Sequence, residues 1–266
     1  MTTEKLISIV MNCYNGEKYL NESLDSIINQ SYTNWELIFY DNCSDDKSAK
    51  IFKSYKDERF SYYKSKETTN LSIARNKAIS LCKGEFIAFL DVDDFWEETK
   101  LIKQSRFLND HIDLIFTDFW LIREKKNNSL NYLKPKKVNL KFKKNIIETL
   151  MENYEIVQST IIIKKKVLQN FTQIYNEKYH IIGDFELFLK IYNHNNIHHL
   201  RQPLAFRRIH KNSESRINIE KTLNELEEFY INNKQNTKIF SNKYELIFLN
   251  SQLIKKILFL LSRKKI

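Results

Sequence analysis

Three aspartates directly follow an apolar run in the stretch FIAFLDVDDFWEE, residues 86–98: Asp91, Asp93 and Asp94. Residues two apart on an extended chain point the same way, so Asp91 and Asp93 face one side if the strand persists to its end. Two carboxylates that close raise one another's pKa unless a cation offsets their repulsion. Because all-oxygen sites suit hard divalent metals, the pair predicts a site for Mg²⁺ or Mn²⁺.

Asp94 has a second interpretation. The stretch DFWE, which begins at Asp94, fits a capping box in which Asp94 is the N-cap of a helix and Glu97 reaches back to it. Capping would explain Asp94, alongside a metal role, but it does not account for Asp91 and Asp93. For that pair, metal or ligand binding is the favoured interpretation.

The composition limits the class of protein. The 266 residues are enough for one α/β domain or for a domain with an appendage, and 42% hydrophobic with 29% charged residues argues against disorder. Three cysteines without a CxxC pair predict reduced thiols in the cytosol and no structural zinc. We expect no signal peptide and no membrane span. The net charge of +10 leaves nucleic acid, anionic lipid and phosphorylated small molecules as candidate partners.

Strand and helix patterns alternate in the first half of the sequence. Strands are expected at 6–11, 35–40, 59–65, 85–90 and 113–122, and helices at 17–30, 45–55, 71–82 and 97–109. This alternation predicts an α/β fold with a mostly parallel sheet covered on both faces. Ligands of such sheets bind at the carboxyl ends of the strands, and there the sequence carries NCYN, DNCSDD and DVDD.

The second half is less regular. Residues 125–144 predict a loop or an irregular hairpin, and 156–168 a strand followed by a helix. Residues 183–194 predict a helix, and 197–209 a strand broken at Pro203. From about Ile217 the pattern is helical.

Five blocks in one order resemble a known family: residues 8–46 of the N-terminal block, LSIARNKAI, GEFIAFLDVDD, IIGDFELFLKI and RRIHKNSES. Together they resemble the inverting nucleotide-sugar glycosyltransferases of family two, which have the Rossmann-like GT-A fold. The resemblance covers roughly residues 6–215. It implies a catalytic domain at 1–215, with a nucleotide-sugar-binding half at about 1–120 and an acceptor-binding half at about 121–215. A basic, amphipathic helical extension would follow at 216–266.

By this resemblance, the loop with Asn12, Tyr14 and Asn15 holds the base and ribose of the nucleotide, although Tyr14 could equally be a packing residue. Asp41 and Asn42 would accept a hydrogen bond from the imide of uracil or thymine. Asn42 stands where the family usually has Asp, and Asp41 could instead bond nearby backbone at the strand end.

The resemblance also assigns the chemistry to charged residues. Arg75 would hold the ribose or diphosphate, unless it is a solvated helix residue. Among the aspartates, one would bind ribose and another the metal; the preferred assignment is Asp91 for ribose and Asp93 for the metal, with Asp94 a further candidate for the metal. His210 would approach the metal or diphosphate, with a surface-loop histidine as the alternative.

Asp184 resembles the catalytic base of the family, in a place where Gly183 replaces the glutamate common in other members. An aspartate at a helix start is otherwise often an N-cap. As the base, Asp184 would take the proton of the acceptor hydroxyl, which attacks the anomeric carbon in one inverting displacement.

The implied function is transfer of a sugar from a nucleotide sugar, most simply a UDP-sugar, to a glycan or lipid-linked acceptor in surface polysaccharide or lipopolysaccharide synthesis. The alternative is a nucleotide-binding protein of the same fold that is no transferase, either nucleotidyltransferase-like or inactive. Nucleic acid is not expected as a partner, because the strand-end edge is acidic.

The last 21 residues, LIFLNSQLIKKILFLLSRKKI, mix apolar and basic side chains. Such a helix can lie on an anionic membrane, with each nearby cation adding about 1 kcal/mol. We therefore expect a cytoplasmic protein that contacts the inner face of the membrane through this tail. The alternative is a tail that packs on the catalytic domain or on a second subunit in a homodimer.

Overall fold

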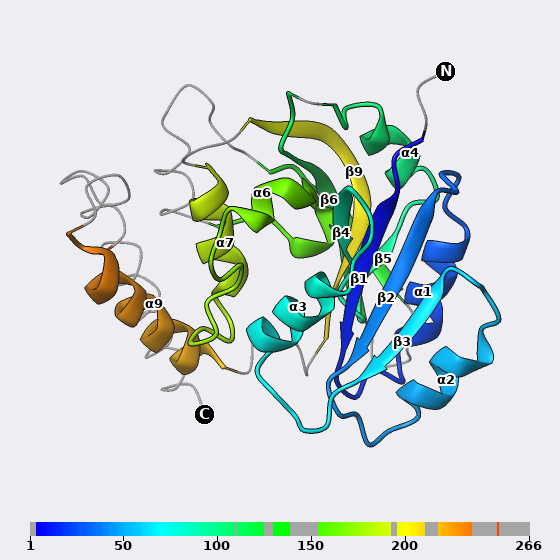
Figure 1. Cartoon of the computed structure of the whole chain (residues 1–266), viewed down its shortest axis with the longest axis horizontal. Helices are drawn as coiled ribbons and strands as arrows, with labels where there is room; N and C mark the ends of the chain where they lie inside the picture. Colours follow the sequence, from blue (N-terminus) through cyan, green and yellow to red (C-terminus); the bar gives the residue numbers. More distant parts are fainter. Residues whose placement is uncertain are drawn as a thin grey trace.

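The computed structural model describes residues 4–109, 111–124, 130–138, 154–192, 196–210, 218–235 and 249. Within these residues a nine-stranded sheet forms the centre (Figure 1), with the strand order β3-β2-β1-β4-β8-β6-β9-β5 and β7 paired to β6. The strands are β1 (Ile7–Cys13), β2 (Trp35–Asp41), β3 (Phe60–Lys64), β4 (Phe86–Phe89), β5 (Phe95–Trp96), β6 (Leu114–Glu124), β7 (Leu130–Lys136), β8 (Ile162–Lys164) and β9 (Ile197–Ile209).

The first four strands form a parallel block. β1 pairs with β2 on one side and with β4 on the other, and β3 extends the block beyond β2. β2 and β4 are buried along their whole length, as expected for parallel strands covered on both faces. The chain moves outward from β1 to β3 and then returns to β4, so the order reverses between β1 and β4. Ligands of open α/β sheets bind at this switch point, outside the carboxyl ends of the strands.

The α/β prediction is confirmed, and the sheet is mixed. β8 lies between β4 and β6 and runs antiparallel to both, so six of the nine described strands point one way and three the other. β9 continues through Pro203, where we expected a break. Its pairing with β6 shifts register at Asp118, opposite Pro203, because proline has no N–H for the ladder. β7 forms a hairpin with β6, one of the two structures expected for this region.

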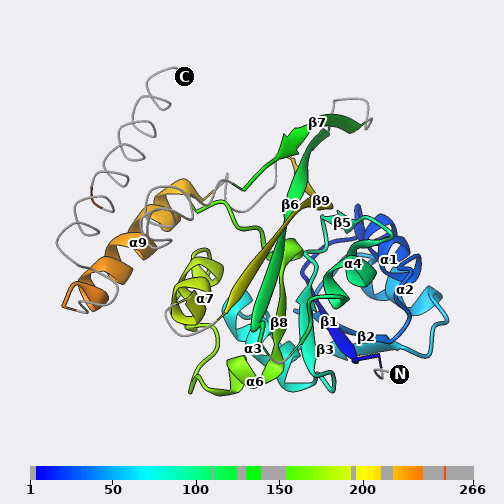
Figure 2. The ribbon, with the colours of Figure 1, turned by 90° about the horizontal axis from the view of Figure 1, so that it is seen from above.

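Helices cover both faces of the sheet. They are α1 (Leu20–Ile28), α2 (Ser48–Ser54), α3 (Leu71–Ser80), α4 (Lys100–Ser105), α6 (Lys165–Gln169), α7 (Gly183–Tyr192) and α9 (Ile219–Asn233), with a 3₁₀ turn η1 at Gln158–Thr160. Figure 2 shows α1 and α2 on one face of the parallel block and α3 and α6 on the other, with α9 beyond α7.

The capping box predicted at Asp94 is wrong. Residues Phe95–Trp96 form the short strand β5, which pairs with β9, and α4 begins only at Lys100. Because the backbone after Asp94 is extended, its carboxylate cannot cap a helix there.

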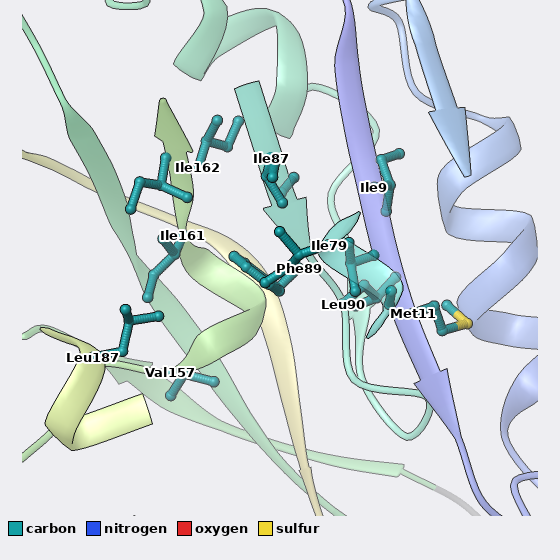
Figure 3. Close-up of a cluster of buried hydrophobic side chains, with 14 of the residues drawn as sticks. Ile9, Met11, Ile79, Ile87, Phe89, Leu90, Val157, Ile161, Ile162 and Leu187 are labelled. Atoms are coloured by element: carbon teal, nitrogen blue, oxygen red, sulfur yellow. The ribbon is translucent and has the colours of Figure 1, made fainter. Parts of the chain in front are cut away.

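One apolar core joins the two halves of the sheet. Ile9 of β1 and Ile87 and Phe89 of β4 lie in the same cluster as Ile162 of β8 and Leu187 of α7 (Figure 3). All five are less than 5% exposed. The core therefore extends across β8 and packs the Asp184-bearing helix α7 against the parallel block.

α9 confirms the helical prediction for residues 219–233. Residues 236–248 and 250–266, and with them the basic tail, lie outside the described residues. In the described part of the chain, no helix combines the length and apolar character needed to cross a bilayer. The domain boundary at residue 215 stays a prediction.

Candidate active site

The loop after β1 lies at the switch point. Asn15 has a positive φ of 53°, and its Oδ1 accepts a hydrogen bond from the backbone N–H of Asp45, 3.1 Å away, which ties this loop to the loop after β2. Tyr14 is 55% exposed, so its ring is not a core packing residue. The buried Nδ2 of Asn12 has no hydrogen-bond acceptor among the described residues. An unsatisfied buried donor at this place is suited to a ligand oxygen.

Asp41 and Asn42 are both engaged within the protein. The fully buried Asp41 accepts hydrogen bonds from the backbone N–H of Ser44 (2.7 Å) and from the hydroxyl of Tyr62 (2.5 Å). The amide of Asn42 donates to the carbonyl of Thr69 (2.6 Å) and accepts from the N–H and hydroxyl of Thr69. These contacts favour the backbone-bonding alternative for Asp41, and they give Asn42 a role in fixing the chain ahead of α3.

The aspartate cluster lies in a turn. β4 ends at Phe89, and the N–H of Asp94 donates to the carbonyl of Asp91 (3.0 Å). The strand therefore does not persist through Asp91 and Asp93, the condition under which the two would face one side, because the chain turns there to enter β5. The turn separates the roles of the three aspartates.

Asp93 faces His210. Its Oδ2 lies 2.9 Å from Nε2 of His210, at the end of β9, and the His210 ring contacts Tyr19 with centroids 4.9 Å apart. The His210 side chain is 9% exposed and that of Asp93 is 30% exposed. His210 therefore lies beside Asp93 and is largely buried, which argues against an exposed surface-loop histidine.

Asp94 is buried, and its side chain links the Asp91–Asp94 turn to neighbouring elements. Its carboxylate accepts from the hydroxyl of Ser159 (2.6 Å) and from the backbone N–H of Arg208 (3.0 Å). Burial, with the nearby charges of Asp93 and Asp91, raises the pKa of Asp94 well above its ordinary value. Because both carboxylate oxygens of Asp94 already have hydrogen-bond partners in the protein, a structural role is favoured over metal binding.

Arg208 completes the support. Its Nε donates to the carbonyl of Asp93 (2.9 Å), and its guanidinium pairs with Glu22 of α1 and lies over the ring of Tyr19. The turn is thus held by α1, η1 and β9 together.

Arg75 and Asp91 form an ion pair at the switch point. Nη2 of Arg75 donates to Oδ1 of Asp91 at 3.1 Å, and the guanidinium lies 5.4 Å from the ring centroid of Tyr175. The Arg75 side chain is only 8% exposed, which excludes a solvated helix residue, whereas that of Asp91 is 41% exposed. Although solvent reaches Asp91, the surrounding protein desolvates it and raises its pKa, against the opposing effect of Arg75.

Asp184 is the second residue of α7. Its Oδ1 accepts from the N–H of Phe185 (2.8 Å), and it is not the N-cap. Burial raises the pKa of Asp184; the positive charge of Arg75 opposes this rise, and the charge of Asp91 adds to it. Asp184 therefore lies within electrostatic range of the Arg75–Asp91 pair.

Gly183 is required by close packing. A Cβ at Gly183 would lie 2.7 Å from Oγ of Ser72, which is held by a hydrogen bond to the carbonyl of Tyr179. Because α3 and α7 approach so closely, this chain has no room for a side chain before Asp184.

The residues fit a metal that arrives with a diphosphate. Among the described residues, no three His, Cys, Asp or Glu side chains are grouped as a ready-made metal site. Asp93 and His210 offer a carboxylate and an imidazole, both of which Mn²⁺ accepts. A metal bound with nucleotides commonly takes its other ligands from phosphate oxygens and water.

The sequence profile described as Glycosyl transferase family 2 matches residues 8–192, which include the whole switch point and Asp184. The chain belongs to this family. A family 2 relative of the chain, an uncharacterized glycosyltransferase of Methanocaldococcus jannaschii, is 34% identical over 191 residues. That alignment spans 70% of this chain and 64% of the relative, so the chain covers less than two thirds of that protein.

A second relative is the UDP-Glc:alpha-D-GlcNAc-diphosphoundecaprenol beta-1,3-glucosyltransferase WfgD of Escherichia coli. It is 31% identical over 195 residues, which are 72% of each chain. Two solved structures share the GT-A fold at low identity. Staphylococcus aureus TarS 1–349 in complex with UDP-GlcNAc has a TM-score of 0.67 and 21% identity, covering 92% of this chain and 72% of TarS 1–349. The mannosyltransferase PcManGT of Pyrobaculum calidifontis, in complex with GDP-Man and Mn²⁺, has a TM-score of 0.69 and 12% identity, covering 96% and 70%.

The sequence did not reveal the residues that hold this candidate site in shape. Ser159 and Arg208 fix the aspartate turn. The hydroxyls of Thr69 and Tyr62 donate hydrogen bonds to Asn42 and Asp41, respectively. Arg208 stands in the RRIH block, so its charge beside His210 was a usable signal. The other three are ordinary polar residues without any signal in the sequence.

Proposed function

We propose that the chain is a metal-dependent inverting glycosyltransferase that moves a sugar from a nucleotide sugar to a hydroxyl of a glycan or lipid-linked acceptor. One observation carries this proposal: the start of α7, which bears Asp184, packs directly against Ser72 of α3, the helix whose Arg75 pairs with Asp91 at the switch point. This packing supports the proposal because it joins the candidate base, from the second half of the chain, to the proposed donor site in the first half.

The donor nucleotide would lie over the ends of β1 and β4. The exposed ring of Tyr14 is available for stacking on the base. Nδ2 of Asn12 and the loop at Asn15 could contact the polar edge of the base. Asp41 and Asn42 would act by shaping this pocket, since their oxygens already accept hydrogen bonds. Asp91, held by Arg75, would accept from a ribose hydroxyl. A UDP-sugar is the favoured donor, because WfgD is named for UDP-Glc and TarS binds UDP-GlcNAc.

Asp93 and His210 would hold Mg²⁺ or Mn²⁺ with the diphosphate of the donor. The metal would neutralise charge on the departing nucleoside diphosphate, a Lewis-acid role. The presence of Mn²⁺ with GDP-Man in PcManGT supports this assignment. Arg75 would add a fixed positive charge beside the same group.

Asp184 would act as the general base. Its raised pKa suits this role, because a base is most effective when its pKa lies nearer the working pH. It would take the proton of the acceptor hydroxyl while that oxygen attacks the anomeric carbon opposite the leaving diphosphate. A single displacement of this kind inverts the configuration and needs no covalent nucleophile.

Surface polysaccharide or lipopolysaccharide synthesis on the inner face of the cytoplasmic membrane is the setting we propose, because WfgD is named for an undecaprenol-linked acceptor. Contact with the membrane through the tail, or a homodimer, stays a prediction. Flotation with anionic liposomes tests the membrane contact: the full chain should float and a tail-truncated chain should not. Equal behaviour of the two would contradict it.

The proposal is tested by a screen of nucleotide sugars with Mn²⁺ or Mg²⁺, measuring release of nucleoside diphosphate. We expect release from at least one donor, its loss on chelation of the metal, and its loss in Asp93→Ala and Asp184→Ala with the fold intact by circular dichroism. Full turnover without metal, or in Asp184→Ala, would contradict the mechanism.

A further inference from the structure

Glu225 is a buried carboxylate on the C-terminal helix α9. It is 6% exposed, whereas Glu227 and Glu228 of the same helix are exposed. Its carboxylate accepts hydrogen bonds from three consecutive backbone N–H groups: those of His180 (2.9 Å), Ile181 (2.8 Å) and Ile182 (3.1 Å). These residues directly precede α7, whose second residue is Asp184.

Three bonds to one carboxylate fix the backbone of this segment. A buried charge is costly unless it is fully hydrogen-bonded, and hydrogen bonds to an ionised acceptor are about twice as strong as neutral ones. The three N–H groups have to converge on one point to satisfy Glu225. That requirement sets the path by which the chain enters α7.

The same segment contacts α3. Nδ1 of His180 accepts from the N–H of Leu71 (3.2 Å), and the hydroxyl of Ser72 donates to the carbonyl of Tyr179 (2.5 Å). α3 also carries Arg75. Residues 179–182 therefore lie between the start of the helix with Asp184 and the start of the helix with Arg75.

α9 holds this segment with apolar contacts as well. Phe229, one turn after Glu225, packs edge-on against Tyr179 and Phe185, with ring centroids 6.2 and 5.5 Å apart. Figure 2 shows α9 alongside α7, far from β1 and β2. α9 thus contacts the chain on both sides of residues 180–182 without touching the donor end of the sheet.

We propose that Glu225 is a positioning residue: by binding the backbone of residues 180–182, it places the Asp184 carboxylate relative to Arg75. The C-terminal helix is then required for catalysis, although the family profile ends at residue 192. The proposal rests on the proposed role of Asp184 as the base.

The test compares Glu225→Gln with Glu227→Gln, an exposed glutamate of the same helix, in the full chain. Glutamine has one acceptor oxygen and turns an amide N–H₂ toward backbone donors, so the three bonds cannot all form. We expect faster hydrogen exchange of the 178–190 region in Glu225→Gln only. Binding of UDP with Mn²⁺ should stay within about twofold of the wild type in both variants, because the residues that we assign to that site, from Asn12 to Asp93 together with His210, are not the backbone groups that Glu225 binds.

Turnover separates positioning from simple loss of stability. In Glu225→Gln we expect kcat to fall about 10- to 100-fold at neutral pH, in line with misplacement of a catalytic group. The acid limb of the pH profile should move to lower pH, because a loosened Asp184 becomes more hydrated and burial is the main cause of its raised pKa. Arg75, Asp91 and Arg207 are the charged groups that also act on Asp184. Glu225→Asp, which keeps the charge, should recover part of the activity.

Two results would overturn the proposal. One is equal hydrogen exchange of the 178–190 region in Glu225→Gln and Glu227→Gln. The other is a kcat in Glu225→Gln that falls by the same factor at every pH, so that the acid limb of the profile does not move. A wild-type chain that releases no nucleoside diphosphate from any donor would overturn the proposed function and the catalytic role of Glu225 together. The exchange comparison distinguishes these failures, because it reports on residues 180–182 whether or not turnover occurs.

Discussion

Nε2 of His210 lies 2.9 Å from Oδ2 of Asp93, although 117 positions separate them in the chain. β9 makes this contact, since it ends at Ile209 beside β5 and the aspartate turn. The two side chains form the part of the site that we assign to the metal.

Substitution of His210 by Gln should lower the affinity for the metal and leave the fold intact. We expect the Mn²⁺ concentration for half-maximal activity to rise at least about tenfold, the effect usual for groups that tune a metal site. Titration of activity with Mn²⁺ measures it, with the exposed His111→Gln as the control. An unchanged titration in His210→Gln would remove His210 from the site.

Asp184→Asn should abolish most turnover while donor binding persists. A general base contributes about 10²- to 10⁴-fold, so we expect kcat to fall by that factor. UDP–Mn²⁺ affinity by calorimetry should match the wild type. Parallel losses in affinity and kcat would show that Asp184 acts on the donor instead.

The pH profile of the wild type should reflect the buried environment of Asp184. The base works only when ionised, so activity falls as the pH decreases through its pKa. Because burial raises that pKa above the ordinary value of 3.8, the fall should begin at higher pH than for an exposed aspartate. A rate measured from pH 4 to 8 that follows an unshifted aspartate would argue against this assignment.

Arg75→Lys should be nearly as harmful as Arg75→Ala. The guanidinium donates to Asp91 and lies over Tyr175, and a lysine cannot reproduce that planar contact. We expect the KM for the donor to rise about 10- to 100-fold in both variants, as follows from loss of a charge-assisted hydrogen bond worth about 1.5–3 kcal/mol. Steady-state kinetics with Lys77→Ala of the same helix as a control would measure this. A wild-type KM for the donor in Arg75→Lys would show that Arg75 contributes only its positive charge.

Gly183→Ala should destabilise the fold by about 1–3 kcal/mol, the usual cost of overpacking. The added Cβ would meet Oγ of Ser72 at 2.7 Å, and this cost outweighs the helix-propensity gain of up to about 1 kcal/mol. Urea unfolding of Gly183→Ala, Ser72→Ala and the double variant should show favourable coupling, because removal of Oγ makes room. Additive losses would contradict the steric explanation.

The alternation of strands and helices in residues 6–122 predicted the parallel block and its switch point, since buried parallel strands are continuous apolar runs. The candidate residues Arg75, Asp91 and Asp93 lie there as expected. His210 could be found only through the family resemblance, because nothing in its local sequence reveals that β9 ends beside Asp93.

Two expectations failed for one physical reason: tertiary pairing overrode the local pattern. DFWE reads as a helix start, yet pairing with β9 holds Phe95–Trp96 extended. Pro203 is a local strand breaker, yet β6 accommodates it by a register shift. The hydrogen bonds of Asp41 with Tyr62 and of Asn42 with Thr69 likewise had no local signal, because those partners are distant in sequence. Glu225 gave no signal, because its partners are backbone groups.

The antiparallel strand β8 limits how this enzyme can move. β8 hydrogen-bonds to β4 along one edge and to β6 along the other, so the strands on its two sides cannot swing apart as hinged lobes without breaking ladder hydrogen bonds. In the proposed transferase, substrates would then enter and products leave through movement of loops at the edge of the sheet. New acceptor preferences would accordingly arise by exchange of those loops, with the strands beneath them unchanged.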